Sequence, residues 1–288
     1  MAKVSFIGLG VMGGPIAGHL AAAGHDVTVY NRSPEKAEAW LGRYKGRSAA
    51  TPALAAEGAD AVFTCVGADH DLEEVTLGPQ GAFATMSPGA LFVDHTTVSA
   101  HLARRLAHEG EERGFLAIDA PVSGGQAGAE NGALSIMCGG THAAFAQAEP
   151  LMKAYAARIV HVGEAGAGQT TKMCNQIAIA GVIQGVAESL RFAQAAGLDT
   201  AKVFEAISAG AAGSWQMQNR WATMAQDQFD FGFAVNWMRK DLGLALEEAR
   251  SNGATLPVAA LIDQFYAEVQ VMGGGRQDTS SIVRRLGR

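Results

Sequence analysis

Residues 4–13 read Val4-Ser5-Phe6-Ile7-Gly8-Leu9-Gly10-Val11-Met12-Gly13, a short strand-like run followed by three glycines in the pattern G-x-G-x-x-G. The first four residues are mostly apolar, as strands buried on both faces are. Pro15 then opens a segment with the composition of a helix. Strand, glycine turn and helix in this order predict the start of a βαβ unit.

The same alternation continues to residue 163. Strands are predicted at Val27–Tyr30, Ala61–Val66, Ala90–Asp94, Phe115–Asp119, Leu134–Cys138 and Ile159–Val162, and helices at Pro15–Ala23, Pro34–Leu41, Ala100–Arg113 and Ala143–Ala154. Strands that alternate with helices indicate a mostly parallel, doubly wound sheet with helices on both faces. We therefore expect an α/β Rossmann domain over residues 1–163.

The second half of the chain, residues 164–288, has a helical pattern. Residues 169–196 contain no Pro and no strand-like alternation, and their central run, Ile177–Ile183, is apolar on all sides. Further helices are predicted at Thr200–Ser208, Val235–Ser251 and Pro257–Gln270. We expect an all-α domain here, joined to the first domain by the long interdomain helix at about 169–196.

The glycine turn predicts a dinucleotide site. Gly8 allows the tight turn, Gly10 lets the backbone approach a pyrophosphate, and Gly13 lets the helix pack on the strand. The second strand then ends in Asn31-Arg32-Ser33, without the acidic residue that accepts hydrogen bonds from the ribose of NAD. Because Arg32 can pair with a 2′-phosphate and its two neighbours can donate to it, we expect NADP in preference to NAD.

Two later segments carry further candidate residues. Asp119-Ala120-Pro121-Val122-Ser123-Gly124-Gly125 ends a strand in a glycine-rich turn, where consecutive N–H groups and a hydroxyl suit a carboxylate. Lys172 stands in the first turns of the long helix, with Asn175 and Gln176 three and four residues later. A lysine on a helix surface is usually solvated, but a partly desolvated one acts as a general acid or base.

Composition narrows the class of protein. The net charge of −6 does not favour nucleic acid or an anionic membrane as a partner. The eight histidines are scattered and the three cysteines are not paired in spacing, so no metal site is expected. No run of 18 apolar residues predicts a membrane span. We expect a cytoplasmic protein, and its apolar helices suggest a homodimer or homotetramer.

Together these segments resemble the β-hydroxyacid dehydrogenase family, which includes 3-hydroxyisobutyrate dehydrogenase, tartronate semialdehyde reductase and glyoxylate/succinic semialdehyde reductase. The resemblance covers nearly the whole chain and rests on four motifs in order, at Gly8–Gly13, Asp119–Gly132, Gly166–Gln176 and Lys240–Leu242. It implies a Rossmann domain followed by a helical domain like that of 6-phosphogluconate dehydrogenase. It also implies a nicotinamide cofactor and a small carboxylate substrate.

The resemblance assigns roles to individual residues. Lys172 is expected to be catalytic. The residues expected to bind substrate are Ser123, Gly124, Gly125, Thr97, Asn175, Gln176, Phe233 and Asp241. Those expected to bind the cofactor are Gly8, Leu9, Gly10, Val11, Met12, Gly13, Asn31, Arg32, Ser33, Val66, Thr97 and Lys240. One branch of the family has Asn in place of Gln176, so the contact could come from either neighbouring amide.

The sequence favours hydride transfer between NAD(P) and a small 3-hydroxy acid or semialdehyde, as in 3-hydroxyisobutyrate dehydrogenase. An NADPH-dependent glyoxylate/succinic semialdehyde reductase is the alternative that Asn31-Arg32-Ser33 favours. The residues from Ser123 to Gly128 are closer to the hydroxyisobutyrate and tartronate branch. A catalytically dead dinucleotide-binding module is the alternative without enzymatic activity, and retention of Lys172 argues against it.

Overall fold

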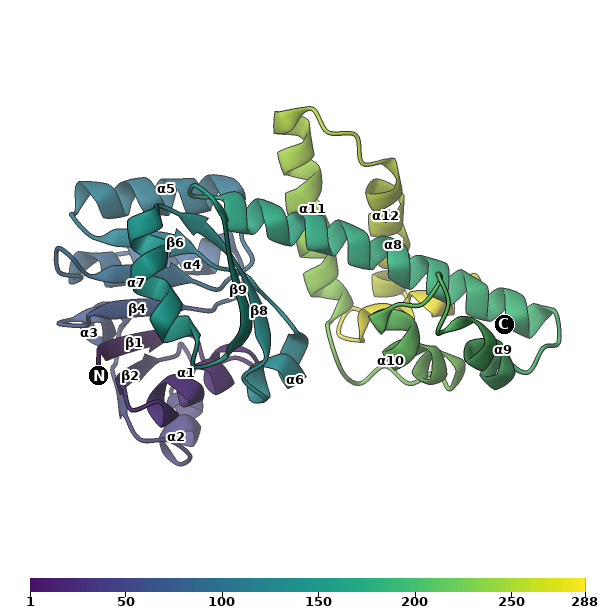
Figure 1. The fold of residues 1–288 in the computed structure, drawn as a ribbon, viewed down its shortest axis with the longest axis horizontal. Coiled ribbons are helices and arrows are strands. Elements are labelled where there is room, and N and C mark those ends of the chain that lie inside the picture. The colour runs from purple at the N-terminus through teal and green to yellow at the C-terminus, as the bar shows by residue number, and fades with distance from the viewer. Residues whose placement is uncertain (288) are drawn as a thin grey trace. The chain divides into compact units, whose positions relative to one another are not determined.

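The computed structural model describes residues 1–287 and separates into two compact units, one of residues 1–172 and one that begins at residue 173. Helix α8 (Ala167–Ala195) begins in the first unit and continues into the second (Figure 1). Each unit has its own hydrophobic core, since the apolar residues cluster separately before and after this point.

The described part of the first unit contains a nine-stranded sheet. Its strands are β1 (Lys3–Ile7), β2 (Asp26–Tyr30), β3 (Arg47–Ser48), β4 (Ala61–Thr64), β5 (Leu91–Asp94), β6 (Leu116–Asp119), β7 (Val122–Ser123), β8 (Leu134–Gly140) and β9 (Ala156–Gly163). Their order is β3-β2-β1-β4-β5-β6-β8-β7, and β9 also pairs with β8. Strands β1 to β6 run parallel, whereas β8 is antiparallel to β6 and β7. The predicted mostly parallel sheet is confirmed.

Helices cover both faces of this sheet (Figure 1). They are α1 (Gly13–Ala22), α2 (Pro34–Leu41), α3 (Pro52–Ala56), α4 (Asp69–Leu77), α5 (Ala100–Glu112), α6 (Gly125–Glu130) and α7 (His142–Met152), with the short 3-10 helix η1 (Ala82–Ala84). Neighbouring strand residues face opposite sides, so Phe6 packs in one core with Leu20 of α1. Ile7 packs in the other core with Leu72 of α4. This doubly covered sheet is the predicted Rossmann domain.

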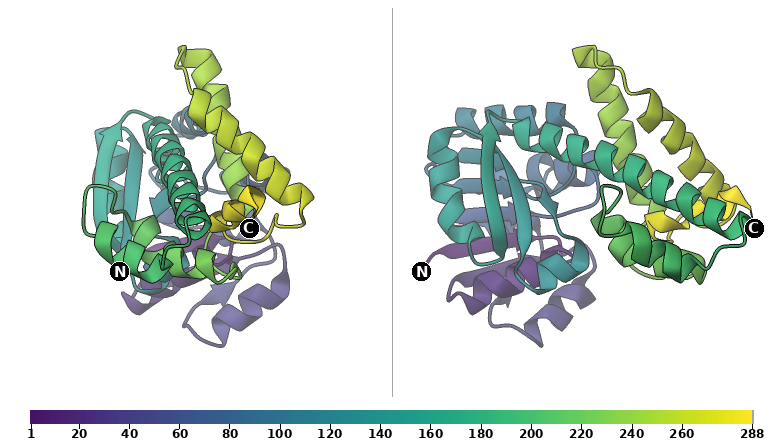
Figure 2. Two further views of the ribbon diagram at one scale, coloured as in Figure 1. Left: turned by 90° about the vertical axis from the view of Figure 1, so that its right-hand side faces the viewer. Right: turned by 45° about the vertical axis from the view of Figure 1, so that its right-hand side comes forward.

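Among the described residues of the second unit, the regular elements are all helices. After α8 come α9 (Thr200–Ile207), α10 (Trp215–Ala225), α11 (Val235–Asn252), α12 (Pro257–Val271) and the 3-10 helix η2 (Thr279–Leu286). Leu190 of α8, Met238 of α11 and Tyr266 of α12 belong to one buried cluster. Figure 2 shows α11 and α12 side by side. The expected all-α second domain is confirmed.

Asp94, at the carboxyl end of β5, is a buried acid. Its Oδ1 accepts hydrogen bonds from Thr64 Oγ1 at 2.7 Å and from the Thr96 N–H at 2.9 Å. Its Oδ2 has no hydrogen-bond partner within residues 1–287. Burial raises the pKa of Asp94 from 3.8 to about 7, against the opposing effect of the hydrogen bonds from Thr96 and Thr64. Below about pH 7, Asp94 is therefore mainly protonated in the folded protein.

We expect this acid to make stability depend on pH. Between 3.8, the ordinary pKa, and about 7, the folded state binds the Asp94 proton more tightly than the unfolded state does, so its contribution to the free energy of unfolding falls as the pH rises. Asp94→Asn keeps the Oδ1 acceptor and removes the titration. Its stability relative to that of the wild type should therefore rise between pH 5 and pH 8 by on the order of 2 kcal/mol. Urea unfolding of both proteins at pH 5 and pH 8 measures this, and a stability difference that does not grow with pH would contradict it.

Candidate active site

The glycine turn joins β1 to α1. Its three glycines differ in what surrounds the position that a Cβ would occupy. Gly8 has φ +101°, and a Cβ at Gly8 or Gly13 would overlap a backbone carbonyl oxygen, that of Cys65 or Gly8 respectively. These two glycines are needed by the protein's own packing. A Cβ at Gly10, in contrast, would meet nothing within 4 Å. Its missing side chain leaves the backbone open to an incoming group, which fits a dinucleotide pyrophosphate at the start of α1.

The segment after β2 is tied to this turn. Asn31 Oδ1 accepts a hydrogen bond from the Leu9 N–H at 2.9 Å, and Asn31 Nδ2 donates to the Ser33 carbonyl at 3.0 Å. The Arg32 side chain is 77% exposed and pairs with Asp71 of α4 at 3.1 Å. Ser33 is the N-cap residue of α2, and its side chain makes no capping hydrogen bond. Asn31 thus organises the backbone, while the two residues after it leave a cation and a hydroxyl at the surface.

The other expected cofactor residues of the first unit lie around the same edge of the sheet. Val11 is 66% exposed at the tip of the glycine turn, whereas Met12 is half-buried. Val66 follows β4, and its N–H donates to Thr96 Oγ1 at 3.1 Å. Since this bond joins the segments after β4 and β5, it brings Val66 close to the loop that contains Thr97.

The start of α8 carries Lys172 to the glycine-rich turn after β6. Lys172 Nζ donates to the Val122 carbonyl oxygen at 2.9 Å, and this bond is buried. Ser123 follows Val122 directly, Gly124 is the N-cap residue of α6, and α6 begins at Gly125. The expected acid–base residue and the expected carboxylate cradle are therefore adjacent, although 50 residues separate Lys172 from Val122.

The start of α8 also meets the loop that holds Thr97. Gln169 donates through Nε2 to the Thr96 carbonyl at 2.7 Å and accepts through Oε1 from the Val98 N–H at 3.1 Å. Asp119, at the end of β6, accepts from N–H groups at the start of α8. Sequence reasoning did not give these two residues a role. The available signals were a carboxylate just before a Pro-containing turn and an amide directly after Gly166-Ala167-Gly168.

In the second unit, α8 and α11 bring four of the expected residues together. Asn175 Nδ2 donates to Gln176 Oε1 at 2.8 Å, and Gln176 Nε2 donates to Asp241 Oδ2 at 2.6 Å. Lys240 Nζ lies 3.3 Å from Asp241 Oδ1 and 5.6 Å from the centre of the Trp237 ring. The amide of Gln176 is thus bonded at both its nitrogen and its oxygen.

Phe233 lies just before α11, and its position is set by the buried carboxylate of Asp278. The Phe233 N–H donates to Asp278 Oδ2 at 2.9 Å, and Asp278 Oδ1 lies 3.1 Å from Arg220 Nε. Asp278 also accepts from the Ser280 N–H. One buried acid therefore holds the loop before α11 against the start of η2.

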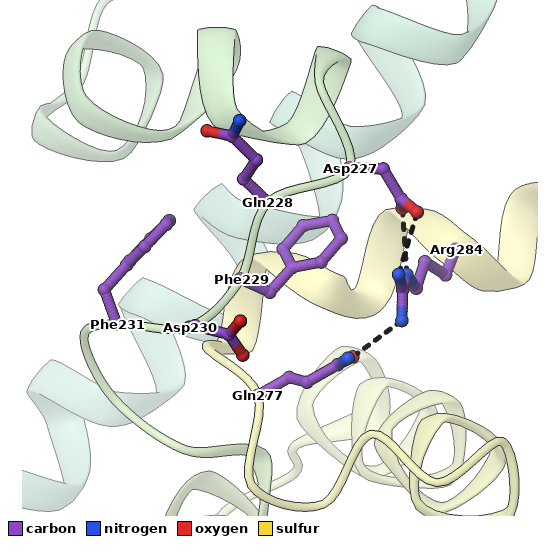
Figure 3. A pocket seen from close by; sticks show the side chains of 7 residues that line it. All are labelled: Asp227, Gln228, Phe229, Asp230, Phe231, Gln277 and Arg284. Carbon is purple, nitrogen blue, oxygen red and sulfur yellow. Dashed lines mark hydrogen bonds and ion pairs between the residues drawn. The ribbon is translucent and has the colours of Figure 1, made fainter.

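A surface hollow in the second unit contains none of the residues expected from the sequence (Figure 3). It is lined by Asp227, Gln228, Phe229, Asp230, Phe231, Gln277 and Arg284. Arg284 is bound to both carboxylate oxygens of Asp227 at 2.8 Å and to Gln277 Oε1 at 3.2 Å. The Arg284 side chain is therefore already bonded to residues of the second unit. We interpret the hollow as a consequence of how the loop at residues 227–231 packs on η2, and not as a ligand site.

Within the described residues, the chain lacks two features that mark other classes of protein, a metal-binding cluster and a membrane-spanning helix. Residues 1–287 contain no group of three or more His, Cys, Asp or Glu residues that could hold a metal ion. No helix within that range is long and apolar enough to cross a membrane.

Known proteins match both parts of the chain. Residues 3–163 match the family model for the NAD binding domain of 6-phosphogluconate dehydrogenase. Residues 166–286 match the model described as NAD-binding of NADP-dependent 3-hydroxyisobutyrate dehydrogenase. An uncharacterized oxidoreductase of Shewanella frigidimarina is 61% identical, covering 99% of this chain and 98% of the relative.

Two further relatives have more specific names. The 2-hydroxy-3-oxopropionate reductase of Escherichia coli is 37% identical, covering 99% of this chain and 97% of the relative. The solved structure of Mycobacterium tuberculosis 3-hydroxyisobutyrate dehydrogenase with L-serine is similar with a TM-score of 0.92 and 30% identity, covering 100% of both chains.

The fold and the two family-model matches define the protein as an oxidoreductase with a nicotinamide dinucleotide cofactor. The chain belongs to the β-hydroxyacid dehydrogenase family. The resemblance inferred from the four sequence motifs is thereby confirmed.

Proposed function

We propose that the protein transfers a hydride between NAD(P) and a small 3-hydroxy acid or its semialdehyde, with Lys172 as the acid–base residue. The observation that carries this proposal is the 2.9 Å bond from Lys172 Nζ to the carbonyl of Val122, directly before Ser123-Gly124-Gly125. A proton-transferring amine and a turn suited to a carboxylate then stand next to each other. A substrate with a hydroxyl close to a carboxylate matches that pair.

The bound nicotinamide would supply the acceptor or donor of the hydride. In oxidation, neutral Lys172 takes the hydroxyl proton as the carbinol becomes a carbonyl. In reduction, the Lys172 ammonium returns a proton to the carbonyl oxygen. The bond to the Val122 carbonyl uses one N–H of the amine and fixes where Nζ lies. In this mechanism, Ser123 and the backbone of Gly124 and Gly125 hold the carboxylate, so that much of the rate comes from positioning.

The remaining assignments belong to the same proposal. Substrate contacts are assigned to Thr97, Asn175, Gln176, Phe233 and Asp241, and dinucleotide contacts to Gly8–Gly13, Asn31–Ser33, Val66, Thr97 and Lys240. Because Gln176 is bonded to both Asn175 and Asp241, we assign it the further task of orienting the amide of Asn175. A homodimer or homotetramer is also part of the proposal, and light scattering after size-exclusion chromatography measures it.

A steady-state screen of 3-hydroxy acids and semialdehydes, each with NAD and NADP, tests the function. We expect turnover with at least one 3-hydroxy acid and none with the corresponding acid that lacks the hydroxyl. Dinucleotide binding without turnover of any of these compounds would instead support a dead binding module. Activity confined to glyoxylate and succinic semialdehyde with NADPH would support the reductase alternative, which the exposed Arg32 and the neighbouring Ser33 hydroxyl favour.

The NADP preference makes a separate prediction. Arg32→Ala should weaken NADP binding by on the order of tenfold and leave NAD binding nearly unchanged, because a charge-assisted hydrogen bond to the 2′-phosphate is lost. Fluorescence titration with both dinucleotides measures the two Kd values. Arg158→Ala, which removes an exposed arginine of β9, is the matched control and should change neither value. An unchanged NADP-to-NAD ratio in Arg32→Ala would contradict the assignment.

A further inference from the structure

The start of α8, the helix that carries Lys172, is anchored by one buried carboxylate. Asp119 Oδ1 accepts from the Gly166 N–H at 2.7 Å, and Asp119 Oδ2 accepts from the Gln169 N–H at 2.8 Å. Asp119 is only 5% exposed and ends β6, an interior strand of the sheet. The amide groups that begin a helix have no partner inside the helix, and a carboxylate is a strong acceptor for them. The rigid sheet therefore fixes where α8 begins.

The chain approaches closely at this anchor. A Cβ on Gly168 would lie 2.5 Å from the Met137 carbonyl oxygen and 2.6 Å from that of Asp119. A side chain at this position would push the first turn of α8 away from β6 and β8. Glycine at this position thus permits the carboxylate to reach both N–H groups, and the start of α8 has little freedom to shift.

Gln169, in the same turn, fixes a second segment. Its side chain is fully buried, and its two hydrogen bonds reach the backbone on either side of Thr97, at the Thr96 carbonyl and the Val98 N–H. The amide supplies one donor and one acceptor in the geometry that these two backbone groups require. Thr97 is therefore held by a residue three positions before Lys172 on the same helix.

The geometry points to Asp119 and Gln169 as positioning residues for the reaction, which hold Lys172 and Thr97 in a fixed relation to each other. Neither residue needs to touch the substrate. Asp119 fixes the position of the start of the helix that carries Lys172, and Gln169 fixes the loop that carries Thr97. The 2.9 Å hydrogen bond from Lys172 to Val122 is the third contact that holds this arrangement. This inference rests on the proposed function, since it requires Lys172 to act in the reaction.

Displacement of a reacting group by about 1 Å can lower a rate by about a hundredfold. Gln169→Leu has nearly the same shape and loses both hydrogen bonds, so we expect its kcat to fall by about tenfold to a hundredfold. Its Kd for NADP should stay within about twofold, because the glycine turn is not altered. Asp119→Asn keeps one acceptor oxygen, and it should retain more kcat than Asp119→Ala.

Thr170→Ala is the matched control within the same helical turn. The Thr170 hydroxyl bonds only locally, to the Gly166 carbonyl at 3.0 Å, and its loss should change kcat by less than about twofold. Hydrogen exchange provides a measurement independent of turnover. In Gln169→Leu, the amides of residues 96–98 should exchange faster, whereas those of the strands β1 and β4 should not change.

The full-length wild type, the variants above and Lys172→Ala should be measured together. Wild-type kcat in Gln169→Leu, together with an inactive Lys172→Ala, would overturn the positioning role and leave the proposed function standing. Wild-type turnover in Lys172→Ala would instead overturn the proposed function. If the loss in the Asp119 variants matched only the fraction of unfolded protein, and Gln169→Leu kept its kcat, the role would be structural and the inference wrong.

Discussion

Lys172→Ala is expected to lower kcat by about a thousandfold or more, with the Kd for the dinucleotide within about twofold of the wild type. The physical reason is that no other acid or base is assigned to the substrate oxygen, and general acid–base catalysis contributes about two to four powers of ten to a rate. The dinucleotide is assigned to the turn between β1 and α1, where this substitution changes nothing. Steady-state kinetics and fluorescence titration measure the two quantities.

A suitable control for this substitution is Lys153→Ala. Lys153 is an exposed lysine after α7 that pairs with Glu149 at 3.0 Å, and we expect its loss to leave kcat unchanged. Wild-type turnover in Lys172→Ala, with the screen showing normal activity of the parent protein, would remove Lys172 from the mechanism.

The second large effect is expected at Gly13. In Gly13→Ala the new Cβ would overlap the carbonyl oxygen of Gly8, and the Phe6 ring, 3.0 Å from the Cβ position, leaves little room to relax. Either the turn or α1 must shift, and we expect a loss in the free energy of unfolding of about 3 kcal/mol or more. Urea unfolding of the whole protein, followed by circular dichroism and compared with the wild type, measures this loss.

Gly10→Ala provides the matched comparison, because the added Cβ would meet no atom within 4 Å. Its stability should stay within about 1 kcal/mol of the wild type. Its dinucleotide affinity should fall by about tenfold or more, since the methyl group would occupy the space left for the pyrophosphate. The interpretation of this turn fails if Gly13→Ala is as stable as the wild type, or if Gly10→Ala binds NADP normally.

Much of the fold could be predicted because the main elements have a clear local pattern. The parallel strands are short apolar runs, and α8 is a long segment without Pro, so both were predicted within a few residues. Helix α4 was missed because Asp69–Leu77 is largely charged and has few apolar positions. Strand β3, at Arg47–Ser48, was missed because its two exposed residues form a strand only through pairing with β2.

The candidate site also has features that the sequence predicts and features that only the structure shows. Lys172 and Ser123-Gly124-Gly125 could be predicted as separate features, and their closeness followed only from the family resemblance. The Asn175–Gln176 pair could not be resolved from sequence, since two neighbouring amides look alike there. The structure distinguishes them, because Gln176 is bonded at both ends of its amide whereas Asn175 is the donor to it.

The order of strands, the glycine turn and the long helix are properties of neighbouring residues, and the chain alone is enough to infer them. The hydrogen bonds of Asp119 and Gln169 at the start of α8 differ, because they join residues that are far apart in the sequence. Asp119 is 47 residues from Gly166, and Gln169 is 73 residues from Thr96. Those bonds form because β5 and β6 lie side by side in the sheet and end at the same edge. Lys172 is recognisable in the sequence, whereas the contacts that fix its place exist only once the sheet has formed.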